Sequence, residues 1–424
     1  MKIFILLIPA LLFGTTLRQV IKGIDENLLV KSQESKVKAM KYLIEDAKGK
    51  SKPKIDIEVS DIRLEETPSA VFYIPNFPPF DVPVGKKDNI TASINFTYPV
   101  FSGFAIDANI NKSKLELIKQ KLKRDDLKRQ LYLKAVELYS AIYSINQAIK
   151  SAKMAKLAIN DSLKLAKGMY ENDLIGAEKL YNIEAKKYQT DALLEEFLAK
   201  KNILQDKLFY LTKKRVDKVT LKMPESSTNI NRLSKIALKD REDIKVIKKD
   251  LGILDEELKM VKSGYYPKVA VVGAVKRESD DFGLGSNGYT NPNKSYIGVS
   301  LKWDLYDGYS TTSQKEAVKA KKEAILFYLK DYENKVITDI KESLWQLKSL
   351  KHLLTAAKKE IKAQKKYLTL TKARFKNSLV SSDELSRAIL SYYKAVAKKE
   401  DIRSKIFLTK YKIMLQTGLK NFHY

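Results

Sequence analysis

The chain has 424 residues, enough for two or three domains of ordinary size. It is 44% hydrophobic and has a mean hydropathy of −0.32, which excludes a disordered tail and a polytopic helical membrane protein. Because it contains no cysteine, it can have no disulfide framework, no thiolate metal site and no lipid-modified N-terminal cysteine.

The charge is strongly basic, with 79 Lys and Arg against 51 Asp and Glu, or +28 in total. Such a charge can indicate a polyanion such as nucleic acid. It can equally come from a large solvated helical surface. The lysines are spread along the helical segments and are not gathered in one block, so we favour the solvated surface and expect no nucleic-acid partner.

The N-terminus carries the pattern of a secretory signal peptide. Lys2 precedes an almost wholly apolar run, Ile3 to Phe13, which is followed by Gly14, Thr15 and Thr16. The run is shorter than the roughly 20 residues that a transmembrane helix needs, and no later stretch is long enough. We expect residues 1–16 to be a signal peptide; the alternative is the start of an ordinary buried helix.

The sequence repeats itself at an offset of 205 residues. Phe101-Ser102-Gly103-Phe104 aligns with Tyr306-Asp307-Gly308-Tyr309, and residues 166–174 align with 371–379 at the same offset without a gap. Each half then has one plan: a helix, two strands and two long helices. The predicted organisation is a signal peptide 1–16, a first repeat 17–213, a linker or equatorial region 214–231, a second repeat 232–418 and a tail 419–424.

Two pairs of strands are predicted, about 55–66 with 89–101 and about 267–278 with 294–306. Apolar and polar residues alternate along the second strand of each pair, for example Val299, Leu301 and Trp303 between polar neighbours. A length of about ten residues also fits a tilted transmembrane β-strand. Along the first strand the parity shifts at Ile62 and Leu64, which indicates a bulge there.

We place these strands in lipid, and the candidate lipid-facing residues are Ile94, Phe96, Val299, Leu301 and Trp303. The alternative is an antiparallel sheet in a soluble protein, covered by helices. In lipid an open sheet edge leaves backbone groups without partners, at several kcal/mol each. Four strands are too few to close, so three chains would have to share a barrel of twelve.

The segments inside the strand pairs are predicted to be extracellular loops. The first contains Pro68, Pro75, Pro78, Pro79 and Pro83, interleaved with aromatic residues, and the second is the glycine-rich segment 280–288.

Long helical hairpins are predicted over 105–213 and 310–418. The first has a heptad seam with strict four–three spacing. Its members are Leu131, Ala135, Leu138, Ile142, Ile145, Ile149 and Ala152. About 60 residues of helix would span roughly 90 Å. Asn172 and Asn377 stand in the turns, where asparagine tolerates the left-handed conformation that ends a helix.

Residues for enzyme chemistry are scarce. His352 and His423 are the two histidines, and there is no Walker A sequence. No catalytic triad or His/Cys metal cluster can be assembled, so we expect no enzyme, no cofactor and no metal site. The chain therefore has no ATP motor of its own, and any energy it needs would come from a partner.

The ordered set of signal peptide, two strand–strand–hairpin repeats and the aromatic-Ser/Asp-Gly-aromatic junctions resembles the TolC family of outer-membrane efflux proteins, over nearly all of the mature chain. The resemblance implies a mixed α+β membrane protein: a homotrimer with a twelve-stranded β-barrel, four strands per protomer, continued by a long periplasmic α-helical barrel. It implies an outer-membrane conduit of an efflux or type I secretion system that extends into the periplasm, partnered by a periplasmic adaptor (a membrane fusion protein) and an inner-membrane RND or ABC transporter.

The resemblance also implies site residues. Glu178, Asp383 and Glu384 match the acidic positions at the periplasmic entrance, although capping of the helix N-terminus is an alternative role for these acids. The adaptor-docking tips would be Asn172, Leu174, Asn377 and Leu379. The family often has glycine before each tip leucine, whereas this chain has Asp173 and Ser378. The competing hypothesis is a non-conducting tether that spans the periplasm.

Overall fold

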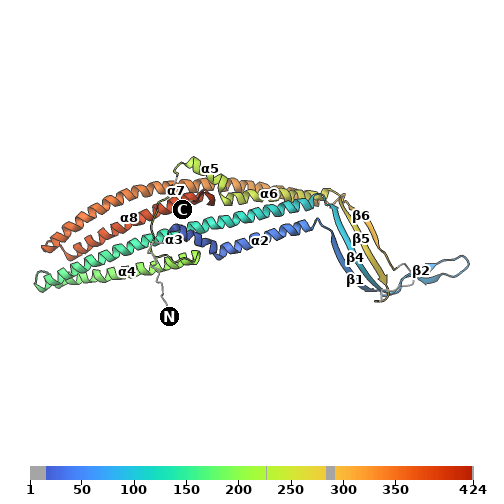
Figure 1. The fold of residues 1–424 in the computed structure, drawn as a ribbon, viewed down its shortest axis with the longest axis horizontal. Helices are drawn as coiled ribbons and strands as arrows, with labels where there is room; N and C mark the ends of the chain where they lie inside the picture. The colour runs from blue at the N-terminus through green and yellow to red at the C-terminus, as the bar shows by residue number, and fades with distance from the viewer. Residues whose placement is uncertain (1–15, 226, 283–291, 423–424) are drawn as a thin grey trace, which may run out of the picture. The chain divides into compact units, whose positions relative to one another are not determined.

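The computed structural model describes residues 16–225, 227–282 and 292–422 (Figure 1). The predicted signal peptide and most of the glycine-rich loop, including Gly283, Gly285 and Gly288, lie outside the described residues.

The described residues of the first half form four α-helices and four strands. They are α1 (Leu17–Lys22), α2 (Leu28–Gly49), β1 (Lys54–Arg63), β2 (Ser69–Phe72), β3 (Phe80–Pro83), β4 (Asp88–Phe101), α3 (Ala105–Glu171) and α4 (Ala177–Thr212). The first predicted loop therefore contains a short hairpin, in which β2 pairs with β3. Its residues Phe72 and Phe80 stack with ring centroids 6.2 Å apart.

The described part of the second half follows the same plan. Its elements are α5 (Ile230–Asp240), α6 (Glu242–Lys262), β5 (Lys268–Ser279), β6 (Tyr296–Lys302), α7 (Ser310–Lys376) and α8 (Ser382–Gln416). The repeat is confirmed at the level of single residues, because α3 and α7 are both 67 residues long and begin 205 positions apart. The left-handed residues recur at the same spacing: Phe104 and Tyr309, and Asp173 and Ser378.

By its internal contacts the chain divides into two units, and each unit takes segments from both repeats. One consists of residues 1–36, 121–247 and 328–424, and the other of residues 37–120 and 248–327. The first unit holds the helical hairpins and most of the apolar core; the second holds the sheet.

In the first unit the four long helices lie in the order α4–α3–α8–α7 (Figure 1). Lys156 of α3 pairs with Asp191 of α4 at 2.8 Å. Ser144 of α3 donates to Asp401 of α8 at 2.8 Å, and Lys398 of α8 pairs with Glu360 of α7 at 2.9 Å. The predicted heptad seam faces this core, since all of its members from Leu131 to Ala152 are buried.

The second unit contains one four-stranded antiparallel sheet in the order β1–β4–β5–β6. The predicted bulge near Ile62 is wrong, because β1 pairs with β4 in unbroken register as far as Arg63 with Asp88. The register shift lies instead between Pro99 and Phe101, where β4 pairs with β5. Proline has no N–H to donate, so the ladder tolerates an irregularity at that position.

Among the described residues, none of the helices is both long and apolar enough to cross a membrane.

Candidate functional site

One face of the sheet is apolar over most of its length, from the row of Ile57 to the end nearest the helices. Residues opposite each other on neighbouring strands share a face. Three cross-strand rows carry apolar side chains: Ile57–Ile94–Val275, then Ile55–Phe96–Gly273–Ile297, then Tyr98–Val271–Val299. Most of these side chains are exposed, Val299 at 71%. The bulge after Pro99 places Phe101 opposite Val269, which is opposite Leu301, so the apolar face continues past the irregularity.

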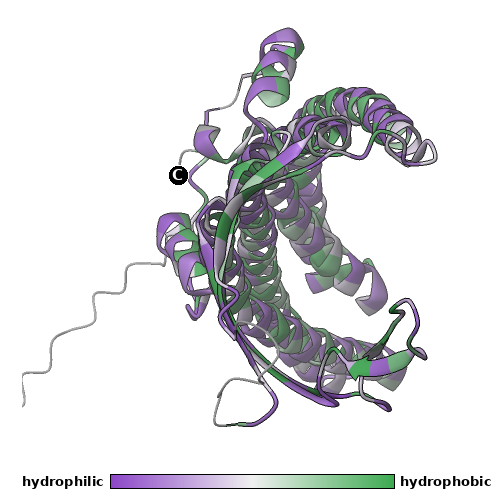
Figure 2. Cartoon of the chain, turned by 90° about the vertical axis from the view of Figure 1, so that its right-hand side faces the viewer, coloured by the Kyte–Doolittle hydropathy of each residue, from purple (hydrophilic) through white to green (hydrophobic). Residues whose placement is uncertain are grey.

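The other face of the sheet is polar. Its rows include Glu58–Ser93–Lys276 and Ser60–Thr91–Glu278. Asn95 donates to Asp56 at 3.1 Å, and Lys276 pairs with Glu278 at 2.8 Å. Figure 2 shows the resulting interleaving of hydrophobic and hydrophilic residues along the strands. A sheet with one apolar and one polar face, both open in a single chain, suits a boundary between lipid and water.

Four of the five predicted lipid-facing residues lie on strands and on the apolar face: Ile94, Phe96, Val299 and Leu301. Trp303 differs, because β6 ends at Lys302 and the indole lies just beyond it. Its Nε1–H donates to the backbone carbonyl of Tyr265 at 3.2 Å. Trp303 therefore anchors the end of the sheet to the turn after α6.

The hairpin turns are two copies of one Schellman motif. The Leu174 N–H donates to the Met169 carbonyl at 2.8 Å, and the Leu379 N–H donates to the Arg374 carbonyl at 3.0 Å. The left-handed residues are Asp173 and Ser378, each with φ of 57°. The prediction that the asparagines take this conformation is therefore wrong by one position.

The side-chain amides of the two asparagines instead cap carbonyl groups in the last turn of each helix. Asn172 Nδ2 donates to the Gly168 carbonyl at 2.7 Å, and Asn377 Nδ2 donates to the Ala373 carbonyl at 3.3 Å. Leucine after a Schellman turn ordinarily packs back on its own helix. Here Leu174 is 62% exposed and Leu379 is 72% exposed, so each tip presents an apolar side chain to its surroundings.

The predicted entrance acids lie at the starts of the returning helices. Asp383 and Glu384 are in the first turn of α8, where Ser381 Oγ accepts from the Glu384 N–H at 3.1 Å. Asp383 pairs with Arg387 at 2.8 Å. Glu178 is in the first turn of α4. In one chain these three acids therefore lie at helix N-termini, and a ring of them requires several copies.

A buried charged cluster, which sequence analysis did not single out, fixes α3, α6 and α7 to one another in the first unit. Asp243 accepts from Arg241 at 2.6 Å, from Tyr332 at 2.9 Å and from Arg129 at 3.0 Å. Burial raises the pKa of Asp243, but the hydrogen bond and charge of Arg241 outweigh it and leave the pKa below its ordinary value. Burial and the charge of Asp243 raise the pKa of Tyr332 to about 12.

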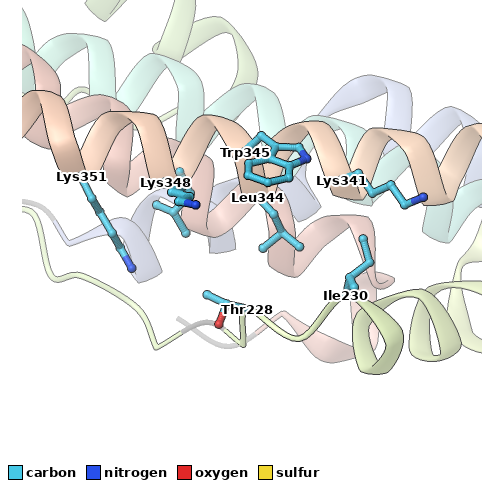
Figure 3. Close-up of a pocket in the computed structure, with 8 residues that line it drawn as sticks. Thr228, Ile230, Lys341, Leu344, Trp345, Lys348 and Lys351 are labelled. Carbon is cyan, nitrogen blue, oxygen red and sulfur yellow. The ribbon is translucent and has the colours of Figure 1, made fainter.

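An open groove of about 650 Å³ lies along the outer side of α7 (Figure 3). Trp345, Leu344, Lys341, Lys348 and Lys351 of α7 line it, and the linker contributes Thr228 and Ile230. This groove is not predictable from the sequence, because only the folded linker places Thr228 beside the helix.

Comparison with known proteins supports the architecture. Residues 233–407 match the family described as outer membrane efflux protein. The CmeC outer membrane channel of Campylobacter jejuni is similar with a TM-score of 0.79 and 14% identity, over 96% of this chain and 86% of that one. VceC, an outer membrane protein of Vibrio cholerae, is similar with a TM-score of 0.76 and 13% identity, over 95% of this chain and 96% of that one.

No curated protein sequence gives a significant match to this one. The family match covers the second repeat, and the structural likeness extends the same fold over both. The second repeat therefore matches the outer membrane efflux protein family, and the chain as a whole has the fold of solved outer-membrane channel proteins.

Proposed function

We propose that three copies of this chain form a passive conduit across the outer membrane and the periplasm. The observation that carries the proposal is the sheet. It has an exposed apolar face and two edge strands, β1 and β6, that each pair on one side only within the described residues. Bare edges are not tolerated in lipid. Three copies of this four-stranded sheet would supply twelve strands and pair every edge.

The orientation of the two faces supports a conduit. The apolar rows would contact lipid, and the polar rows with Glu58, Lys276 and Glu278 would line a wet interior. The helical hairpins would continue the wall in the periplasm.

The tips fit a role in assembly. A periplasmic adaptor would dock on the exposed tip leucines, Leu174 and Leu379, and on the neighbouring Asn172 and Asn377. The adaptor would connect the conduit to an RND or ABC transporter of an efflux or type I secretion system. Glu178, Asp383 and Glu384 of three copies would surround the periplasmic entrance. Like charges around one axis repel each other and attract cations.

Planar-bilayer recording on purified trimer tests the conduit. Stepwise conductance is expected, because an aqueous lumen bounded by a closed wall conducts ions. Trimers that insert into the bilayer and carry no current would contradict the conduit and support the non-conducting tether.

A further inference from the structure

A row of lysines follows one side of the C-terminal part of α7. Lysines and two threonines recur there in strictly alternating steps of four and three residues, and all of them are exposed. This lysine seam consists of Lys351, Thr355, Lys358, Lys362, Lys365, Thr369, Lys372 and Lys376. Because the spacing keeps side chains on one face of a helix, the seam runs for about 38 Å and ends at the hairpin turn.

The lysines of the seam have no counterions in their own chain. Residues 351–376 contain a single acid, Glu360, and its carboxylate pairs with Lys398 of α8 at 2.9 Å. Among the described residues, no seam lysine forms an ion pair. Earlier in the same helix, by contrast, Lys319 pairs with Glu316 at 2.9 Å. Like charges three and four residues apart destabilise a helix, so the seam carries a repulsion that a partner could relieve.

The internal repeat does not account for the seam. At the equivalent positions of α3, 205 residues earlier, the lysines are interrupted by an apolar residue, two asparagines and an acid. These positions are Asn146, Lys150, Lys153, Leu157, Asn160, Lys164, Lys167 and Glu171. Most of them are exposed, as in α7. A mixed composition therefore suffices to keep this helix face in water, and the uniform charge is particular to α7.

Two open grooves lie on either side of the seam. One, of about 380 Å³, has Leu368 of α7 and Tyr392 of α8 in its wall. The other, of about 460 Å³, contains Leu370. Lys365 and Thr369 line both grooves, so apolar surface borders the row of charges on its two sides. A flexible polyanion would need only the charges, whereas a folded partner can also place apolar side chains in the grooves.

We propose that the lysine seam is a docking surface for an acidic amphipathic helix of another protein. Two helices that lie side by side keep facing rows in contact when both rows have the four–three spacing. The partner helix therefore carries carboxylates at that spacing, which pair with the seam lysines. Its flanking apolar side chains enter the grooves at Leu368 and Leu370. This surface extends along the side of α7 and is distinct from the exposed tip leucine, Leu379.

Fluorescence anisotropy with two labelled alanine-based helical peptides tests the proposal on the full chain, purified in detergent. Both peptides are four heptads long and contain the same number of glutamates. In the first the glutamates have the four–three spacing, and in the second they are distributed around the helix. The first peptide should bind several-fold more tightly, and added salt should weaken its binding. K362E/K365E/K372E should weaken binding of the first peptide at least tenfold.

The matched control K153E/K164E/K167E makes the same change of charge on the equivalent face of α3 and should bind the first peptide like the wild type. Light scattering and circular dichroism check that both variants keep the assembly and helicity of the wild type. Equal binding of the two peptides, or equally tight binding of unstructured polyglutamate, would show a general polyanion site and overturn helix docking. Absence of peptide binding, or equal losses in the two triple variants, would also overturn it.

Discussion

Two residues in the hairpin turns hold a backbone conformation that suits glycine better. Asp173 and Ser378 both have φ of 57°, and a side chain in this region costs about 1 kcal/mol or more. The surrounding Schellman hydrogen bonds hold both residues there, since the following leucines donate to carbonyls of the preceding helices. The cost is therefore local, and it is removable without changing the turn.

D173G and S378G are each expected to stabilise the protein by about 1 kcal/mol, measured as the free energy of urea unfolding in detergent. D173G should gain slightly more, because an acid at a helix C-terminus opposes the helix dipole. K164G is the control: Lys164 is exposed within α3, so glycine there should cost about 1 kcal/mol. If D173G and S378G lower the free energy of unfolding, the backbone at these two positions is not strained.

The buried cluster around Asp243 is expected to contribute strongly to the stability of the protein. D243N should destabilise the protein by about 3–5 kcal/mol, because it leaves the buried Arg241 without its carboxylate partner and removes one of the acids that pair with Arg129, which keeps Asp126 and Glu242. The control E137Q breaks an exposed pair with Lys134 and should cost less than about 1 kcal/mol.

The same cluster has a pH signature. The pKa of Asp243 is lowered in the folded protein, so its stabilisation is present above the ordinary aspartate value of about 3.9 and is lost as the pH falls through the folded pKa. Thermal unfolding of the wild type and D243N should differ by a constant amount from pH 8 to about pH 5. The gap should narrow below about pH 4, and a gap that widened there would refute the assignment.

Membrane assembly of the protein depends on which face of the sheet contacts lipid. Leu301 lies on the apolar face opposite Val269, and Ser300 lies on the other face opposite Ala270. L301R should reduce membrane assembly of the protein, because an arginine on the lipid face costs about 2–4 kcal/mol at mid-depth and about 1 kcal/mol or less near the interface.

S300R is the matched control, one residue away on the same strand. It points to the polar side and should leave membrane assembly near the wild-type level, measured as heat-resistant oligomer in outer-membrane fractions. If S300R fails and L301R assembles, the two faces of the sheet are reversed.

For the whole assembly, the entrance acids act only as a set contributed by several chains. E178A/D383A is expected to weaken block of the channel current by polyvalent cations severalfold, because the ring of carboxylates is lost. R387A should act in the opposite direction, since Arg387 pairs with Asp383 at 2.8 Å and its removal frees the carboxylate. Equal block in wild type, E178A/D383A and R387A would place the cation site elsewhere.

Features that repeat or alternate along the chain are predictable from its sequence alone. The 205-residue offset predicted two equivalent halves, and the heptad from Leu131 to Ala152 predicted the buried seam of α3. Alternation along β4 and β6 predicted the apolar face that carries Ile94 and Leu301. These features are local, because helix and strand periodicities fix which side chains share a face.

Other features depend on contacts between residues that are distant in the sequence, and these appear only in the folded chain. The bulge lies at Pro99 and not at Ile62, because pairing with β5 sets the register there. The cluster around Asp243 brings together Arg129 and Tyr332, which are more than 200 residues apart in the chain. The left-handed turn position falls on Asp173 and not on Asn172, whose side chain is occupied with the Gly168 carbonyl. In each case the outcome depends on hydrogen bonds and charges that exist only once the chain has folded.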